Sequence, residues 1–363
     1  MRVSKLIGTF AVVSLALVGC GGDTNEPTTQ TSESTSTGSS SAPEETGEEP
    51  QSPDYQIGMA FDVGGRGDQS FNDAAAAGLD RAADELGVGF QEAAAETGEA
   101  ETQREERLRT LADAGFNPII AVGFAYGASV ALVAPEYPDV QFAIVDSDAA
   151  STPGDNVTNL IFAEEQGSFL VGAAAALKSE AGHIGFVGGV EVPLIQKFQA
   201  GYAAGAQAVN PDITIDVTYL TQPPDFSGFA DPAKGRTAAE GMYQGGADIV
   251  YQAAGGSGGG VFEAAAAAGA FAIGVDSDQY NLVAPEIQPV IITSMLKKVD
   301  VAVYDFIIAV NEGTVESGDV IFDLEADGVG YSTTGGAIDD ISADLEAFKE
   351  QIISGEIEVP TTP

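Results

Sequence analysis

The stretch from Tyr55 to Gly87, YQIGMAFDVGGRGDQSFNDAAAAGLDRAADELG, decides the fold. Its first seven residues are mostly apolar and fit a short buried strand, and the glycine-rich segment 62–70 that follows is typical of a loop. From residue 71 onward, apolar side chains recur every three or four positions, as on one face of a helix: Ala75, Leu79, Ala82 and Leu86. Gly87 is a common helix stop. Strand, loop and helix together form one unit of a parallel α/β sheet.

The same alternation continues along most of the chain. The sequence predicts strands at Tyr55–Phe61, Pro118–Val122, Val140–Val145, Val157–Phe162, His183–Val187, Ile213–Tyr219, Ile249–Gln252, Phe271–Val275 and Val290–Met295. It predicts helices at 71–87, 101–115, 126–135, 164–179, 194–209, 231–245, 258–269 and 297–311. Because more than eight strands are predicted, two open, doubly wound parallel sheets fit better than one closed barrel. We expect lobe 1 at about 54–162 plus part of 277–325, and lobe 2 at about 163–276 plus the C-terminal segment.

Composition excludes several classes of protein. The 363 residues include 55 Asp and Glu but only 14 Lys and Arg, one His and one Cys, for a net charge of −41. Such a charge argues against nucleic acid as a partner, because that binding needs clustered basic residues. A single Cys excludes a disulfide framework and cysteine-based zinc clusters, and a single His excludes multi-histidine metal sites. We expect no metal and no cofactor.

The N-terminus has the layout of an export signal. Arg2 and Lys5 precede an apolar run at 6–18, which is too short to span a membrane. Leu17-Val18-Gly19-Cys20 resembles a prokaryotic lipobox, which predicts a signal peptide at 1–20 and a lipidated Cys20; the alternative is a signal peptide that happens to end near a cysteine. Residues 21–53 contain no Leu, Ile, Val, Phe, Tyr or Met and predict a disordered acidic linker. We therefore expect residues 54–363 to work on the extracytoplasmic face of a membrane, held there by the lipid.

The acidity extends beyond the linker. From residue 54 to the end, 12 basic residues stand against 48 acidic ones, a net charge of −36. Such an excess destabilises a folded protein by self-repulsion unless salt screens it. We interpret it as adaptation to a salty environment. A cation-binding surface is the alternative, but no calcium-loop spacing supports it.

Candidate binding residues follow the predicted strands. In parallel sheets, ligands bind at the carboxyl ends of strands. Those positions hold acids, glycine-rich loops or an aromatic: Asp62, Gly123-Phe124, Asp146, Gly188-Gly189, the loop around Gly255, and Asp276. The pattern indicates a polar cleft in which backbone approaches the ligand closely.

At these positions the chain resembles the basic membrane protein family, substrate-binding lipoproteins of ABC importers that include purine nucleoside receptors. The similar stretches are IGMAFDVGG (57–65) with DQSFN (68–72), YPD (137–139) with VD (145–146), EEQGSFLVG (164–172), GHIGFVGG (182–189), FQAGY (198–202), GVDSDQ (274–279) and TSMLKK (293–298). The resemblance runs in order over about residues 55–350. It implies a type I periplasmic-binding-protein fold, with two lobes, a hinge and a ligand cleft between them.

The resemblance also implies roles for individual residues. Phe71 and Phe198 would sandwich a nucleobase, and Asn72 would hydrogen-bond its edge. Asp276 would accept the ribose hydroxyls, with Lys297 as its ammonium partner. Asp62 and Asp146 would line the same pocket, and Ser70, Phe124 and Gly255 complete the candidate set. Some relatives carry an acid or an aromatic in the segment that reads Tyr126-Gly127-Ala128-Ser129 here, so base selectivity is left open.

The leading hypothesis is therefore a non-enzymatic, monomeric receptor that delivers nucleosides to an ABC permease and its ATPase. Receptors of the same fold for a sugar or a signalling molecule, and a Rossmann-type dinucleotide enzyme, are the alternatives. The enzyme is disfavoured because no Gly-x-Gly-x-x-Gly turn follows the first strand. From pattern alone, Phe71 and Phe198 could be core residues, Asp62 and Asp276 helix caps, and Lys297 a surface residue at a helix start. The glycine run 254–260 lacks the Gly-Lys-Ser/Thr ending of a phosphate loop, and His183 has no catalytic partners in the sequence.

Overall fold

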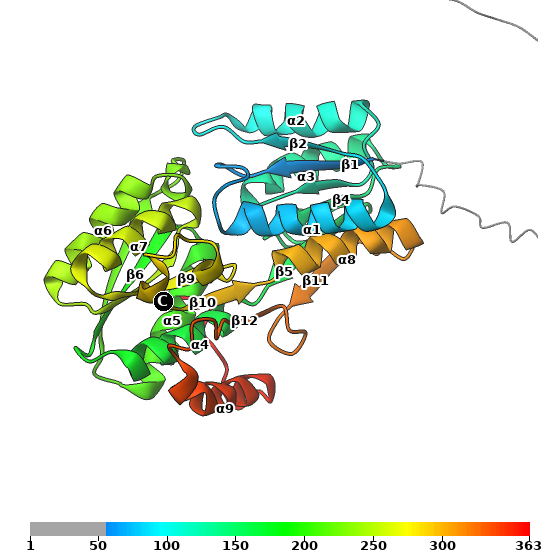
Figure 1. Ribbon diagram of the computed structural model, residues 1–363. Helices are drawn as coiled ribbons and strands as arrows, with labels where there is room; N and C mark the ends of the chain where they lie inside the picture. The colour runs from blue at the N-terminus through cyan, green and yellow to red at the C-terminus, as the bar shows by residue number, and fades with distance from the viewer. Residues whose placement is uncertain (1–55) are drawn as a thin grey trace, which may run out of the picture. The chain divides into compact units, whose positions relative to one another are not determined.

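The computed structural model describes residues 56–363, which form two α/β lobes (Figure 1). The fold class expected from the sequence is confirmed: each lobe is built on a six-stranded, mainly parallel sheet. The predicted signal peptide, Cys20 and the linker lie outside the described residues. Within the described part, no helix combines the length and apolarity needed to cross a bilayer.

Lobe 1 contains a sheet in which all strands run parallel. Its strand order is β11-β5-β4-β3-β1-β2. The strands span Ile57–Phe61 (β1), Phe90–Ala94 (β2), Ile119–Ala121 (β3), Phe142–Val145 (β4), Val157–Phe162 (β5) and Gly318–Phe322 (β11). The inner strands are apolar on both faces and almost wholly buried, as parallel strands between two helix layers must be.

Lobe 2 repeats this plan with one reversed strand. Its order is β12-β10-β9-β8-β6-β7, and only β12 is antiparallel to its neighbour. The strands span His183–Val190 (β6), Thr214–Thr221 (β7), Ile249–Ala253 (β8), Phe271–Asp276 (β9), Ile291–Lys297 (β10) and Val329–Tyr331 (β12). Lys297 is therefore the last residue of a strand and is buried, so the expectation of a helix from residue 297 is wrong at that position.

Helices cover the faces of both sheets. Their bounds are Phe71–Leu86 (α1), Glu101–Asp113 (α2), Gly127–Val133 (α3), Glu164–Lys178 (α4), Pro193–Val209 (α5), Pro232–Gly245 (α6), Gly258–Ala268 (α7), Val299–Glu312 (α8) and Ser342–Ile353 (α9). Helices α4 and α5 pack so closely that a Cβ atom at Gly205 would lie 1.9 Å from the Phe169 carbonyl oxygen. Only glycine permits this approach, which fixes the helix that carries Phe198.

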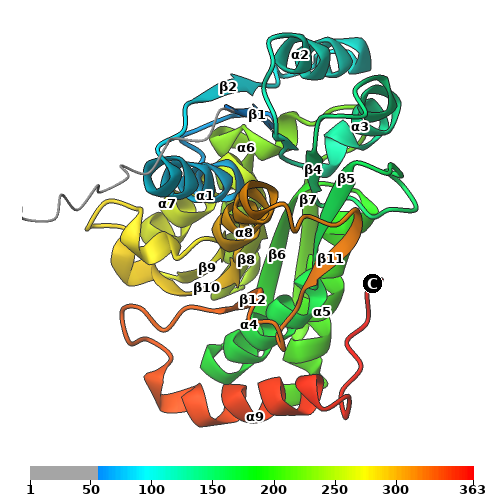
Figure 2. The same ribbon diagram turned by 90° about the vertical axis from the view of Figure 1, so that its right-hand side faces the viewer.

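The chain passes between the lobes three times. It crosses from β5 to α4, from β10 to α8, and from β11 to β12, and the crossings lie close together in Figure 2. Helix α8 follows a lobe 2 strand but packs on α1 of lobe 1. Three short connections therefore join the two lobes, two of them a single residue at a strand–helix junction, which is the arrangement of a hinge.

Candidate functional site

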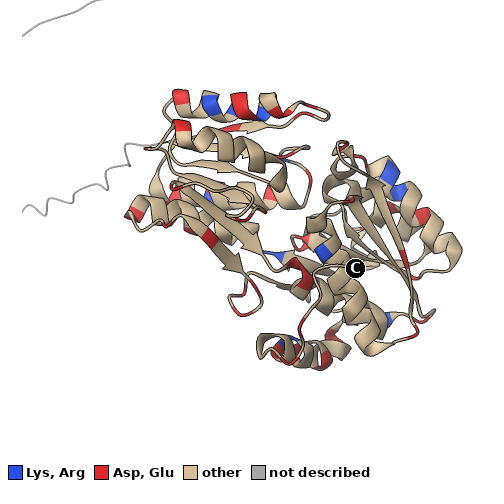
Figure 3. Cartoon of the chain, turned by 180° about the vertical axis from the view of Figure 1, so that it is seen from behind, with Lys and Arg blue, Asp and Glu red and all other residues tan. Residues whose placement is uncertain are grey.

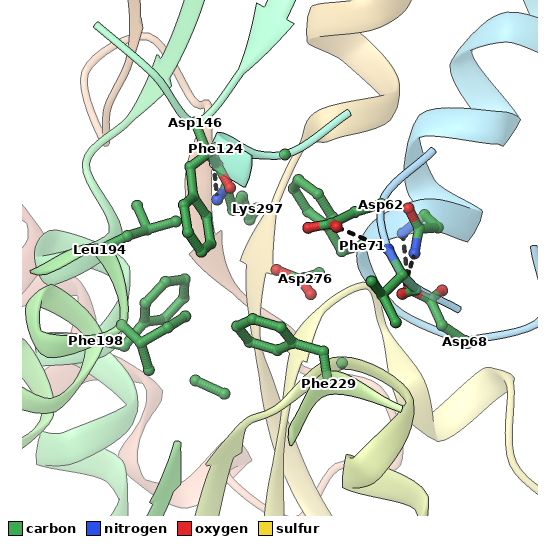
Figure 4. Close-up of a pocket in the computed structure, with 16 residues that line it drawn as sticks. Asp62, Asp68, Phe71, Phe124, Asp146, Leu194, Phe198, Phe229, Asp276 and Lys297 are labelled. Atoms are coloured by element: carbon green, nitrogen blue, oxygen red, sulfur yellow. Dashed lines mark hydrogen bonds and ion pairs between the residues drawn. The ribbon is translucent and has the colours of Figure 1, made fainter. Parts of the chain in front are cut away.

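A cleft lies between the lobes, at the carboxyl ends of their strands. Its lining residues come from both lobes: Asp62, Val63, Asp68, Phe71, Asn72, Gly123, Phe124, Asp146, Leu194, Ile195, Phe198, Phe229, Ala253, Gly255, Asp276 and Lys297. Figure 4 shows the labelled phenyl rings and carboxylates converging on one space.

The structure brings the candidate residues together. Nine of the ten residues in the candidate set line the cleft: Asp62, Phe71, Asn72, Phe124, Asp146, Phe198, Gly255, Asp276 and Lys297. The tenth, Ser70, is buried behind the cleft wall, and its hydroxyl donates a hydrogen bond to Asp276 Oδ2. Ser70 thus positions a carboxylate of the other lobe. Of the other strand-end glycines, Gly123 lines the cleft, whereas Gly188 and Gly189 are not among its lining residues.

Two of the cleft carboxylates stand on backbone in the left-handed region. Asp146 follows β4 with φ 69°, and Asp276 ends β9 with φ 63°. Aspartate is among the few residues other than glycine that adopt this conformation with little strain. One strand belongs to the sheet of lobe 1 and the other to the sheet of lobe 2, so each sheet places a short acidic side chain at the edge that faces the cleft.

Asp62 is held at the end of β1 by its own loop. Its Oδ1 accepts a hydrogen bond of 2.7 Å from the Val63 amide. Gly123 lies against its other oxygen with φ 107°, and a Cβ atom there would stand 2.7 Å from Asp62 Oδ2. Burial raises the pKa of Asp62 to about 6, although the Val63 amide and the charge of Arg104 favour the ionised form.

Asp276 lies under the centre of the cleft and is 8% exposed. Burial raises its pKa to about 7, and the Lys297 ammonium and the Ser70 hydroxyl offset part of that rise. A ligand that donates hydrogen bonds to this buried carboxylate stabilises its ionised form.

Lys297 is the centre of a buried ion cluster. Its Nζ lies 2.6 Å from Asp146 Oδ1 and 3.1 Å from Glu164 Oε1, and all three side chains are at most 5% exposed. Burial by itself would lower the Lys297 pKa, but the neighbouring carboxylates outweigh it and raise that pKa. Burial raises the pKa of Asp146 to about 6, despite the ammonium beside it.

Aromatic rings surround the same ammonium. Lys297 Nζ lies 5.2 Å from the centroid of Phe71, 5.0 Å from that of Phe162 and 5.6 Å from that of Phe198. These contacts fix the lysine and place Phe71 and Phe198 on either side of it. Both rings also line the cleft, while Phe198 belongs to the buried core and Phe71 packs against that core.

Asn72 presents an amide with spare hydrogen-bonding capacity. It is 3% exposed, and its Nδ2 makes one long contact of 3.5 Å with the Val63 carbonyl oxygen. Its Oδ1 is buried and makes no hydrogen bond within the described residues. A buried amide of this kind can bind the polar edge of a ligand.

Sequence reasoning missed four side chains that shape the site. Asp68 lines the cleft and accepts hydrogen bonds from the amides of Ser70, Asn72 and Asp73 at the start of α1. An Asp just before a helix is a capping signal that could have been recognised. No distinctive sequence pattern marks the other three, which are Leu194 and Ile195 at the start of α5 and Phe229 in the loop before α6.

Other sequence motifs take no part in the cleft chemistry. Tyr126 and Ser129 are fully buried in lobe 1, where the Tyr126 hydroxyl donates to the Phe61 carbonyl oxygen and Ser129 donates to Glu101. The only histidine, His183, lies 2.9 Å from Asp216 at the start of β6, far along the strand from the cleft edge.

Comparison with known proteins places the chain in a family. The family model described as ABC transporter substrate-binding protein, PnrA-like (Bmp) matches residues 55–363. A CD4+ T-cell-stimulating antigen of Listeria innocua is 34% identical over 90% of this chain and 94% of its own length. The ABC transporter nucleoside-binding protein BmpA of Lactococcus lactis is 31% identical over 85% and 90%. A solute-binding protein of an ABC transporter system from Aeropyrum pernix has a TM-score of 0.73 and 32% identity, covering 85% of this chain and 93% of its own. The chain belongs to the Bmp family of ABC transporter substrate-binding proteins.

Proposed function

We propose that this protein captures purine nucleosides between its lobes and delivers them to an ABC permease at the outer face of the cell membrane. The observation that carries this proposal is the combination of phenyl rings and hydrogen-bond-accepting carboxylates around one cleft. A nucleoside has flat aromatic faces, an edge of donors and acceptors, and vicinal hydroxyls. Phe71 and Phe198 suit the faces, Asn72 suits the edge and Asp276 suits the hydroxyls.

The charge of the cleft supports a neutral ligand. Among residues 56–363, Lys297 is the one basic side chain that lines it, and Asp146 and Glu164 already neutralise that ammonium. Asp62, Asp68 and Asp276 add further carboxyl groups. A nucleotide phosphate would therefore meet negative charge without a free cation, which disfavours binding. The name of the Lactococcus lactis relative, a nucleoside-binding protein, agrees with this choice.

The test is calorimetry with guanosine, inosine, adenosine and AMP, together with mass spectrometry of any ligand released when the purified protein is denatured. We expect the nucleosides to bind and AMP to bind at least tenfold more weakly than adenosine, because one unpaired charge in the cleft costs more than about 1.4 kcal/mol. Tighter binding of AMP than of adenosine would refute the proposal.

We further propose that a lipid on Cys20 holds the protein at the membrane, and that residues 21–53 tether the folded part. The lipobox-like sequence and the lipoprotein names of related proteins from three Pyrococcus species support this. Replacement of Cys20 by Ser should move the protein from the membrane fraction to the soluble fraction in its host. An unchanged membrane fraction would exclude lipidation at Cys20 as the anchor.

A further inference from the structure

The loop between β7 and α6, residues 222–230, reaches from lobe 2 to lobe 1; we term it the closure arm. Phe226 and Phe229 are carried on it around a short helical turn at Ser227–Phe229. Phe229 lines the cleft, whereas Phe226 is not among the cleft-lining residues. Phe226 therefore makes contacts that serve something other than direct ligand binding.

The arm is firmly attached to lobe 2. Ser257 Oγ donates to the Gly228 carbonyl oxygen at 2.7 Å and accepts from the Asp231 amide at 2.8 Å. Thr221 Oγ1 donates to the Asp225 carbonyl oxygen at 2.6 Å. At Gly228 the arm lies so close to β6 that a Cβ atom would stand 2.0 Å from the Gly189 carbonyl oxygen. These anchors make the arm move with lobe 2.

The tip of the arm contacts lobe 1 through aromatic edges. The Phe226 ring lies 5.9 Å from the Phe124 ring at an interplanar angle of 69°, and Phe229 lies 6.5 Å from Phe124 at 73°. The Arg104 guanidinium, also of lobe 1, lies 5.8 Å from the Phe226 centroid. The two ring pairs have the distances and angles of favourable edge-to-face contacts. The distance between Arg104 and Phe226 is that of a cation–π contact. Figure 4 shows Phe124 and Phe229 reaching the cleft from opposite sides.

A ligand bound here would contact groups from both lobes. The polar groups that would hold it are nearly inaccessible: Asp62 and Asp276 are 8% exposed, and Lys297 is 2% exposed. Separation of the lobes about the three crossings would break the contacts of Phe226 with Phe124 and Arg104. Each contact that exists only when the lobes meet favours the closed arrangement and slows release.

We propose that Phe226 is a positioning residue for ligand retention: by holding the closure arm against Phe124 and Arg104, it keeps the lobes together without touching the ligand. The proposal rests on the proposed function in its choice of guanosine as probe. The contacts themselves are independent of which solute is transported.

The first test is the rate of guanosine release from Phe226→Ala, measured by stopped-flow chase at fixed salt. We expect release about two- to tenfold faster than from the wild type, which is the range for loss of an edge-to-face aromatic pair. Phe271→Ala is the matched control, because Phe271 is a half-exposed phenylalanine of lobe 2 at the outer start of β9. The control should release guanosine at the wild-type rate. Equal rates for Phe226→Ala and Phe271→Ala would overturn the proposal.

A double-mutant cycle tests the contact itself. Phe124→Ala removes both a cleft-lining ring and the partner of Phe226. If the rings act together, adding Phe226→Ala to Phe124→Ala should change release by less than it does in the wild type. Full additivity of the two effects would show that Phe226 acts independently of Phe124 and would overturn the proposal.

The second test needs no ligand. Spin labels at Glu106→Cys in α2 and Gln244→Cys in α6, both exposed, report the separation of the lobes in the full chain with Cys20→Ser. Phe226→Ala should enrich the longer distances relative to the wild type and to Phe271→Ala. If guanosine fails to bind the wild type, the nucleoside proposal fails, but the spin-label distances still test the role of Phe226. Identical distance distributions in Phe226→Ala and the wild type would overturn the proposed role of Phe226.

Discussion

Replacement of Lys297 by Met is expected to destabilise the folded protein strongly. Met has a similar length and no charge, so the change leaves Asp146 and Glu164 buried without the ammonium that lies 2.6 and 3.1 Å from them. Removal of one partner from a buried ion pair costs about 3–5 kcal/mol. For about 310 folded residues, that loss lowers the melting temperature by about 5–8 °C.

The next residue along the chain supplies the control. Lys298 forms a surface ion pair with Asp327, and the two side chains are 31% and 72% exposed. Because exposed pairs contribute little, Lys298→Met should shift the melting temperature by at most about 2 °C. Calorimetric or circular-dichroism melts at one salt concentration compare the two variants. Equal stability of Lys297→Met and Lys298→Met would refute the electrostatic reasoning.

The pH dependence provides a second check on the same variant. Without the ammonium, the pKa of Asp146 in the folded state rises further above its unfolded value, so the folded state binds more protons than the unfolded state near neutral pH. Stability then falls as pH rises through that folded pKa. The deficit of Lys297→Met should therefore be larger at pH 8 than at pH 5. A triple variant with Asp146→Asn and Glu164→Gln should recover most of the loss at pH 8, since it removes the unpaired charges.

Three other predictions concern binding and salt. Asp276→Ala should weaken guanosine binding by about 2–4 kcal/mol and Phe71→Ala by about 1–3 kcal/mol, as measured by calorimetry on folded variants; unchanged affinity in Asp276→Ala would place the hydroxyl partner elsewhere. Burial raises the Asp276 pKa to about 7, so guanosine affinity should fall up to about tenfold per pH unit below 7 and level off above it, while Asp276→Asn should lose that dependence. The melting temperature should rise steeply from about 0.1 M to molar KCl, because salt then screens the repulsion among the acidic residues visible on both lobes in Figure 3. Guanosine affinity should change little with salt, because guanosine is neutral. A melting temperature independent of salt would contradict the interpretation of salt adaptation.

The sequence predicted the inner strands and the edge strand β7 well, but it missed the other three edge strands. An inner strand such as β1 is a continuous apolar run because helices bury both its faces. β2 and β11 lie at sheet edges, are largely exposed and carry polar residues, while β12 has only three residues. Helix α9 buries little more than Leu345 and Ile352, so its apolar stripe is too sparse to be recognised. An apolar sequence pattern indicates a buried strand or helix. These elements are barely buried, so their sequences lack that pattern.

The site residues also divide into those that the sequence predicted and those that it did not. The rule that ligands bind at strand ends found Asp62, Asp146 and Asp276 because those positions depend only on where strands stop. Phe198 and Lys297 were assigned from family resemblance, because Phe198 lies within helix α5 and Lys297 ends β10 two residues beyond the predicted strand end at Met295. The contact of Glu164 with Lys297 depends on how α4 packs on β10 within lobe 2, whereas the contacts of Phe226 and Phe229 with Phe124 depend on how one lobe packs on the other. No local pattern specifies that packing.

The balance of charge in the cleft connects stability with ligand choice. Four carboxyl groups line it against one ammonium, and burial raises the pKa of each: Asp62, Asp68, Asp146 and Asp276. Ionised carboxylates whose pKa values are raised by burial oppose folding, so the protein retains them at a cost. A partner that donates hydrogen bonds without adding negative charge lowers that cost, whereas a phosphate raises it. The same groups that weaken the folded state thus favour a neutral solute rich in hydroxyl and N–H donors.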